Sequence, residues 1–128
     1  MELRILVAGS RSFEDFETLS NVLTEFLAPF SKEKFSPVII SGTAKGADQL
    51  GEQYGIKHNI PIRRFPADWK RYGRAAGMIR NNQMLDHICE KGCVGAVVAF
   101  WDGKSKGTAH TISEAKRREV EHLHINYF

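Results

Sequence analysis

Four short segments of the sequence combine glycine with residues that can bind phosphate or ribose. The first is Gly9-Ser10-Arg11-Ser12. Glycine allows a sharp turn, a following helix offers free N–H groups to an anion, and arginine can donate two parallel hydrogen bonds to phosphate. An ordinary turn whose serine caps the next helix also explains these residues. Taken alone, this segment favours the ordinary turn.

The second segment is Ser41-Gly42-Thr43-Ala44-Lys45-Gly46-Ala47-Asp48. Its two glycines, small side chains and lysine suit a backbone cradle for a phosphate or a ribose. The spacing of a P-loop is absent. Asp48 lies just inside the next expected helix, where it either hydrogen-bonds a ribose hydroxyl or complements the helix dipole, an effect of about 0.3–1 kcal/mol. We weigh these two roles evenly.

The third segment places Asp68 and Trp69 before a basic, glycine-containing stretch. An aromatic ring between an acid and basic residues can stack on a base or a sugar. The alternative is a surface loop whose tryptophan folds over the core. In the helix that follows, Asn81 falls within the apolar arc and Arg80 borders it. A buried amide needs hydrogen-bond partners, so Asn81 either holds a neighbouring loop or contacts a ligand.

The fourth segment, Trp101–Thr108, is a second loop of glycine, serine and threonine that runs into a helix N-terminus. Two such loops on adjacent strand–helix units favour a ligand site over plain turns. We expect a Cβ at Gly46 or Gly107 to intrude on the ligand while leaving the core intact. The candidate ligand-binding residues are Gly9, Ser10, Arg11, Ser41, Gly42, Lys45, Gly46, Asp48, Asp68, Trp69, Arg80, Asn81, Trp101, Asp102, Gly103, Ser105, Gly107 and Thr108.

Apolar segments of two kinds alternate along the chain and define the elements that must position these residues. Five of them are expected to be strands: Leu3–Ala8, Pro37–Ile40, Ile60–Phe65, Val94–Phe100 and His122–Tyr127. Helical periodicity lies between them, over Phe16–Phe30 with a capping box at Ser12 and Asp15, over Ala47–Tyr54, over Met78–Cys89 and around Ile112 and Ala115.

The alternation predicts an α/β fold: a Rossmann-like, doubly wound sheet of about five parallel strands in three α/β/α layers. In such sheets a ligand lies outside the carboxyl ends of the strands, near the point where strand order reverses. All four polar segments follow a predicted strand. We therefore expect them to meet at one edge of the sheet.

Bulk properties fit a single domain over residues 1–128, with 42% hydrophobic residues and a net charge of +3. That charge suits an anionic ligand and is too small to argue for nucleic acid by itself. No apolar run is long enough for a membrane span, and no signal-peptide pattern is present, so we expect a cytoplasmic protein without a membrane partner. Cys89 and Cys93 are interpreted as reduced thiols. No metal site or cofactor is predicted, and a homo-oligomer is compatible with the sequence.

The spaced motifs, read together, are similar to the stand-alone YspA-like family of the SLOG superfamily, which includes the LOG phosphoribohydrolases and the DprA/Smf proteins. The motifs are Gly9-Ser10-Arg11, Ser41-Gly42-x-Ala44-x-Gly46-Ala47-Asp48, Ala67-Asp68-Trp69, Ala76-Gly77-x-x-Arg80-Asn81-x-x-Met84 and Trp101-Asp102-Gly103-x-Ser105-x-Gly107-Thr108. The resemblance implies a Rossmann-like fold and a nucleotide-derived ligand. Small members of this kind are frequent in phage and mobile elements, so it also implies a role in host–phage conflict.

The chain departs from the related families at two positions. The YspA-like pattern usually has a second glycine where this chain has Thr43. The LOG enzymes place a catalytic glutamate three residues after the threonine, a position that is Thr111 here. An N-glycosidase needs a carboxylate beside the ribose to stabilise an oxocarbenium-like state. LOG-type hydrolysis would therefore need another carboxylate.

Three functional hypotheses follow. The first is a binding module or sensor for a nucleotide-derived ligand. The second is a nucleotide hydrolase in which Arg80 holds phosphate and Asp48, Asp68 or Asp102 supplies the carboxylate. The third, by analogy with DprA/Smf, is a single-stranded nucleic-acid binder with Trp69 as a stacking platform. Its basic track would consist of Lys45, Arg63, Arg64, Lys70, Arg71 and Arg74.

Overall fold

The computed structural model describes residues 1–128 and contains one five-stranded, all-parallel sheet. Its strand order is β3-β2-β1-β4-β5. The strands are β1 (Glu2–Gly9), β2 (Ser36–Ser41), β3 (Ile62–Arg64), β4 (Val94–Trp101) and β5 (His122–Tyr127). Strand order reverses between β1, which pairs with β2, and β4, which pairs with β1 on its other side. The switch point that the sequence led us to expect therefore lies between β1 and β4.

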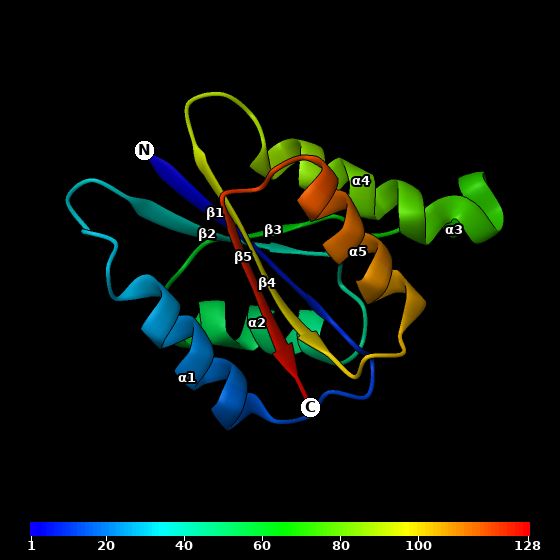
Figure 1. Ribbon diagram of the computed structural model, residues 1–128, viewed down its shortest axis with the longest axis horizontal. Coiled ribbons are helices and arrows are strands. Elements are labelled where there is room, and N and C mark those ends of the chain that lie inside the picture. The colour runs from blue at the N-terminus through cyan, green and yellow to red at the C-terminus, as the bar shows by residue number, and fades with distance from the viewer.

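Helices cover both faces of this sheet, which confirms the predicted three-layer fold (Figure 1). The helices are α1 (Phe16–Leu27), α2 (Ala47–Lys57), α3 (Trp69–Tyr72), the 3₁₀ turn η1 (Gly73–Ala75), α4 (Ala76–Ile88) and α5 (Lys106–Arg117). In Figure 1, α1 and α2 lie on one side of the strands and α4 and α5 on the other. None of the helices is both long and apolar enough to span a membrane.

Two apolar clusters, one on each face, hold the layers together. Alternate residues of β1 belong to different clusters: Ile5 and Val7 pack with residues of α1 and α2, whereas Leu6 and Ala8 pack with residues of α4 and α5. The central strands are apolar at consecutive positions because both of their faces are covered. The sheet is therefore buried except at its edges, and polar side chains gather at the strand ends.

The capping box expected at Ser12 and Asp15 is wrong. Asp15 itself is the N-cap of α1, and its carboxylate accepts hydrogen bonds from the backbone N–H of Thr18 at 3.0 Å and from the Thr18 hydroxyl at 2.6 Å. The helix begins later because Phe13 is buried, with its ring stacked on that of Phe100 at 4.8 Å between centroids. Because this ring is buried, the residues from Ser12 to Glu14 lie outside the helix.

The third strand is shorter than predicted, and the segment after it is helical. Only Ile62–Arg64 pairs with β2, because Pro61 has no N–H to donate and Ile60 instead donates to the carbonyl of Gly55 in α2. The stretch after β3, where the sequence predicted no helix before Met78, forms α3, which Asp68 caps by accepting from the backbone N–H of Arg71 at 3.2 Å. This short helix and η1 lead directly into α4.

Candidate functional site

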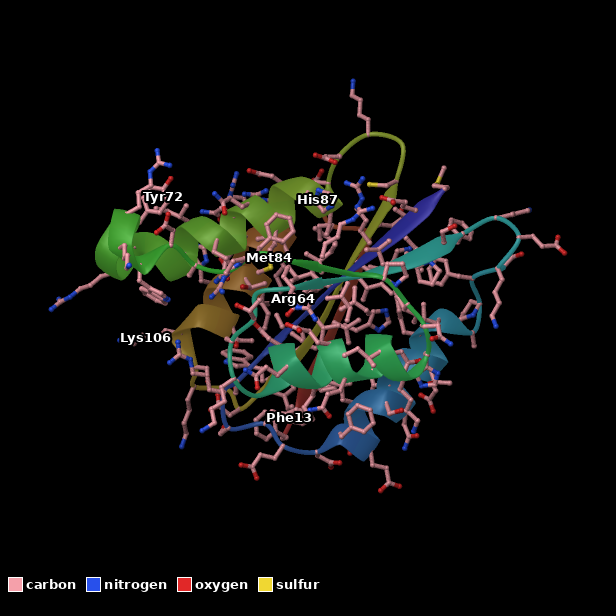
Figure 2. The ribbon with its side chains drawn as sticks, turned by 180° about the vertical axis from the view of Figure 1, so that it is seen from behind. Phe13, Arg64, Tyr72, Met84, His87 and Lys106 are labelled. Atoms are coloured by element: carbon pink, nitrogen blue, oxygen red, sulfur yellow. The ribbon has the colours of Figure 1, made fainter.

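A cleft of about 560 Å³ lies at the carboxyl edge of the sheet, near the β1–β4 switch point. It is bounded by the loop after β1, the start of α2, α3 to α4, and the start of α5. Figure 2 shows Lys106 at the first turn of α5 and Met84 between α4 and the sheet. The lining residues are Ala8, Gly9, Ser10, Arg11, Ser12, Ala44, Asp48, Trp69, Arg74, Gly77, Met78, Arg80, Asn81, Met84, Ser105, Lys106, Gly107, Thr108 and Thr111.

The structure brings part of the predicted site into this cleft and leaves part of it outside. The predicted residues that line the cleft are Gly9, Ser10, Arg11, Asp48, Trp69, Arg80, Asn81, Ser105, Gly107 and Thr108. Those outside the lining are Ser41, Gly42, Lys45, Gly46, Asp68, Trp101, Asp102 and Gly103. Most of the second group have identifiable roles in holding the loops.

Ser10 joins the loops that follow β1, β2 and β4. Its buried hydroxyl accepts from the backbone N–H of Asp102 at 3.2 Å and is hydrogen-bonded to the hydroxyl of Ser105 at 2.9 Å. Its carbonyl accepts from the backbone N–H of Ala47 at the start of α2. Since buried polar groups of this kind hold their partners firmly, Ser10 fixes the spacing between the start of α2 and the start of α5.

Asp102 shapes the loop before α5. One carboxylate oxygen accepts from the backbone N–H groups of Lys104 and Ser105, both at 2.8 Å, and from the Ser105 hydroxyl at 3.0 Å. These bonds, chiefly that from the Ser105 backbone, hold the pKa of Asp102 at about 2. The Trp101 indole donates to the Ser105 carbonyl at 3.0 Å and so supports the same turn.

The two glycines expected to act alike differ in their surroundings. A Cβ at Gly46, whose φ is +86°, would lie 2.5 Å from the Ser10 carbonyl oxygen and 2.6 Å from that of Arg11. Contrary to the expectation above, a side chain there would disrupt the packing of two loops. A Cβ at Gly107 would meet nothing within 4 Å. Of these two glycines, only Gly107 leaves its backbone accessible from the cleft.

Arg80 is held with part of its guanidinium directed toward the cleft. Nε donates to the side-chain oxygen of Asn81 at 2.9 Å, and Nη1 donates to the carbonyl of Gly42. Nη2 has no hydrogen-bond partner in the protein. Partial burial lowers the pKa of Arg80; the nearby Asp48 carboxyl opposes this shift and Arg11 adds to it. The buried Asn81 thus orients the arginine.

Asp48 is the only acidic residue lining the cleft. The residue is 7% exposed, and Oδ2 accepts from the backbone N–H of Ala44 at 3.1 Å, while Oδ1 has no hydrogen-bond partner in the protein. Burial raises its pKa to about 6, against the opposing effects of that hydrogen bond and of Arg80. A carboxyl with a raised pKa in a cleft is a candidate for ligand contact or proton transfer.

The cleft carries a strong excess of positive charge. Four cationic side chains line it, namely Arg11, Arg74, Arg80 and Lys106, against the single carboxyl group of Asp48. None of the four forms an ion pair with an acidic side chain within 4 Å. Concave walls of one charge sign concentrate oppositely charged solutes. The site therefore suits an anion.

The predicted ligand-binding residues did not include several of the lining residues, namely Ala8, Ser12, Ala44, Arg74, Gly77, Met78, Met84, Lys106 and Thr111, of which Arg74 was expected only in the basic track. Helical spacing could have found two of them, because Gly77, Arg80, Asn81 and Met84 follow one another at the i, i+3, i+4 and i+7 positions of a single helix face. That face of α4 forms one wall of the cleft.

The position that LOG enzymes use for glutamate faces the cleft but carries no acid. The hydroxyl of Thr111 donates to the Gly107 carbonyl at 3.2 Å within α5. Glu114, one turn further along, pairs with Arg117 at 2.8 Å and lies outside the lining. A carboxylate for hydrolysis in this cleft would therefore have to come from Asp48.

Two of the six residues of the basic track expected to bind nucleic acid form ion pairs with carboxylates of the protein instead. Arg63 pairs with Glu2 at 2.5 Å, and Arg64 pairs with Glu52 at 2.7 Å. Of the six basic residues proposed for that track, only Arg74 lines the cleft.

The parallel sheet, with its reversal at β1–β4 and the cleft at that reversal, defines a Rossmann-like α/β protein. The family model described as "YspA, cpYpsA-related SLOG family" matches residues 3–72, more than half of the chain. The protein belongs to this family, as its motifs led us to expect.

One similar protein is the Gene 61 protein of Mycobacterium phage D29. It is 29% identical over 122 residues, and the match covers 91% of each chain. A relative in a phage fits the phage context that the motifs implied. No solved structure matches the chain.

Proposed function

We propose that the cleft binds a nucleotide or a nucleotide-derived ligand, and that the protein acts as a binding module or sensor for it. The observation that carries this proposal is the Arg80 guanidinium, which Asn81 and Gly42 hold in place while Nη2 remains free at the cleft. A pre-positioned guanidinium is well suited to bind phosphate. Membership of the SLOG family supports a nucleotide-related function.

The start of α5 supplies a second set of donors in the same cleft. The first backbone N–H groups of a helix have no partner within the helix. The N-cap residue, Ser105, makes no side-chain capping bond to them. Lys106, Gly107 and Thr108 line the cleft, and the glycine leaves the backbone accessible. Helix dipole, free N–H groups and a lysine all favour an anion at this place.

Calorimetric titration tests this proposal, using the 5′-monophosphates and 5′-diphosphates of the four common ribonucleosides, and NAD. We expect at least one of them to bind. Arg80→Ala should weaken its binding by about 1.5–3 kcal/mol, roughly ten- to a hundred-fold, through loss of a charge-assisted hydrogen bond. Lys116→Ala, exposed on α5 and outside the cleft, is the control and should bind normally. The absence of binding by the whole series, or unchanged binding by Arg80→Ala, would contradict the proposal.

A second candidate function uses the same ligand and is favoured by one specific observation. Asp48 presents a carboxyl whose pKa is raised to about 6 beside Arg80, and such a group exchanges a proton readily near neutral pH. The cleft would then hydrolyse an N-glycosidic or phosphoester bond of a nucleotide. Chromatography of the same nucleotides after incubation should show a released base or phosphate, and Asp48→Asn should abolish it. Intact nucleotides throughout would leave binding as the function and exclude hydrolysis of these compounds.

A further inference from the structure

Two large apolar side chains are exposed on one wall of the cleft, where α3 meets α4. The Trp69 residue is 53% exposed and Met78 is 52% exposed, although most large apolar residues of this protein are buried. Both line the cleft. Trp69 forms no aromatic pair with another ring, and its indole N–H has no hydrogen-bond partner in the protein. Neither an aromatic pair nor a hydrogen bond therefore holds the indole ring of this tryptophan in the fold.

Gly77 lies between this apolar wall and Arg80. From the position that a Cβ of residue 77 would occupy, Cη2 of Trp69 lies at 3.5 Å and Nη2 of Arg80 at 3.9 Å. Cη2 of Trp69 and Nη2 of Arg80 therefore both lie within contact distance of the space that a side chain at residue 77 would fill. The missing side chain leaves a shallow recess that joins an aromatic surface to a phosphate-binding group.

Nothing in the fold itself requires glycine at this position. Gly77 lies in the first turn of α4, its φ is not positive, and an added Cβ would make only ordinary contacts. Glycine is less favourable than alanine in a helix, by up to about 1 kcal/mol in the helix interior. Gly51 of α2 differs, because a Cβ there would lie 2.8 Å from the Val7 side chain. The glycine at 77 therefore points to a ligand.

We infer that the recess formed by Trp69, Gly77 and Met78 seats the aromatic base of a nucleotide whose phosphate is held by Arg80. This inference rests on the proposed function and adds where the base lies and which residues select it. A base can stack on an indole face, and a methionine thioether makes favourable contacts with an aromatic ring. The expected ligand is then a nucleoside phosphate that binds with its base and its phosphate close together in space.

The test compares adenosine, guanosine, cytidine and uridine 5′-monophosphates with ribose 5-phosphate, which lacks a base. Calorimetry on the full chain should show the nucleotide binding about 5- to 100-fold more tightly than the sugar phosphate, the range expected for one stacked base. The variant Gly77→Ala should remove most of this preference by filling the recess, while its affinity for ribose 5-phosphate stays within two-fold. Its melting temperature should be equal to or above that of the wild type.

Trp69→Leu and Met78→Ala give a second route, since both side chains are exposed and their loss should leave folding intact. Each should lower nucleotide affinity without changing that for ribose 5-phosphate. Gln83→Ala, at an exposed position of α4 outside the cleft, is the matched control and should change neither. Nucleotide binding should also quench tryptophan emission, and this quench should disappear in Trp69→Leu.

The outcomes separate this inference from the proposed function. If ribose 5-phosphate and the nucleotides bind equally, and the Gly77, Trp69 and Met78 variants behave as the wild type, the base seat is wrong and the phosphate site stands. If neither the nucleotides nor the sugar phosphate binds, both are overturned.

Discussion

At the scale of single residues, the central feature is a buried carboxyl beside a partly buried arginine. Asp48 and Arg80 influence each other's pKa, and both line the cleft. The protein tolerates the burial of Asp48 although only one backbone N–H donates to its carboxylate. Burial of a charge with so few partners is costly in free energy. Such a cost is typical of a group retained for a ligand.

This cost predicts a measurable pH dependence. The pKa of Asp48 is about 6 in the folded protein and 3.8 as its ordinary value, so the folded state binds more protons between these two pH values. The contribution of Asp48 to stability is therefore lost as pH rises from about 3.8 to about 6. The loss amounts to roughly 3 kcal/mol, because each pKa unit corresponds to about 1.4 kcal/mol. Asp48→Asn should remove it.

Denaturant unfolding of the wild type and of Asp48→Asn at a series of pH values measures this effect as a difference between the two proteins. Taking the difference cancels the opposite contributions of Glu2 and Asp102, whose pKa values are lowered to about 2. The variant should gain stability relative to the wild type as pH rises through the window and then remain level. Parallel curves for the two proteins would show that Asp48 titrates normally.

Thr43 has an unusual backbone conformation. Its φ is +65°, which is strained for a β-branched residue and is where the YspA-like pattern usually has glycine. Thr43→Gly should therefore raise the free energy of unfolding by about 0.5–1 kcal/mol, as the relief of strain exceeds the added chain entropy. Thr43→Ala keeps a Cβ and should gain less. Thermal melts compare the three proteins, and a destabilised glycine variant would contradict this account of the loop.

At the scale of elements, the loops after β1 and β2 are packed backbone to backbone, whereas the start of α5 is open. Gly46→Val should therefore destabilise the protein by more than 2 kcal/mol, through steric overlap with the Ser10 and Arg11 carbonyls and a positive φ. Gly107→Val should leave the melting temperature nearly unchanged and weaken nucleotide binding.

A thermal melt beside a calorimetric titration distinguishes the two variants. Equal loss of stability in both would mean that Gly107 is also an ordinary packing residue. Normal nucleotide binding by a folded Gly107→Val would mean that the start of α5 does not contact the ligand.

The order of the elements and the edge at which the polar loops meet could be predicted from the sequence. Continuous apolar runs and helical periodicity are local patterns that do not depend on the conformation of the loops. Helix α3 was missed because four residues are too few to show a period, although Asp68 carries the capping signal. The three-residue length of β3 depends on contacts of Ile60 with α2, which no local pattern reveals.

The site itself was only partly predictable, because a polar residue beside a ligand and one that holds a loop have the same sequence signature. Asp102 and Ser41 illustrate this: the first accepts from the backbone of its own loop, and the second donates to Glu52 at 2.7 Å. Conversely, Gly77 was part of a family motif that gave it no role, and Met78 carried no signal beyond the helical periodicity of α4. Their role depends on the position of Trp69, which tertiary structure sets.

At the scale of the whole molecule, the two ends of the sheet differ in whether their cationic side chains form ion pairs. At the amino end, Arg4 and Arg63 both pair with Glu2, and Arg4 also pairs with Glu90. At the carboxyl end, the cationic side chains that line the cleft have no acidic partner within 4 Å. The four cationic side chains of the cleft are thus available to an anion at this end of the sheet. An anionic ligand should therefore find one preferred end of the molecule.

Backbone N–H chemical shifts of the ¹⁵N-labelled protein, followed by NMR during titration with the tightest-binding nucleoside 5′-monophosphate, test the central claim most directly. We predict saturable shifts that are largest at Gly107 and Thr108, at Gly77 and in the loop after β1, with the side-chain Nε–H of Arg80 shifting at the same ligand concentrations. Shifts confined to the amino end of the sheet, around Val94 and Gly95, or no saturable shift with any of the nucleotides, would contradict the assignment of this cleft as a nucleotide-binding site.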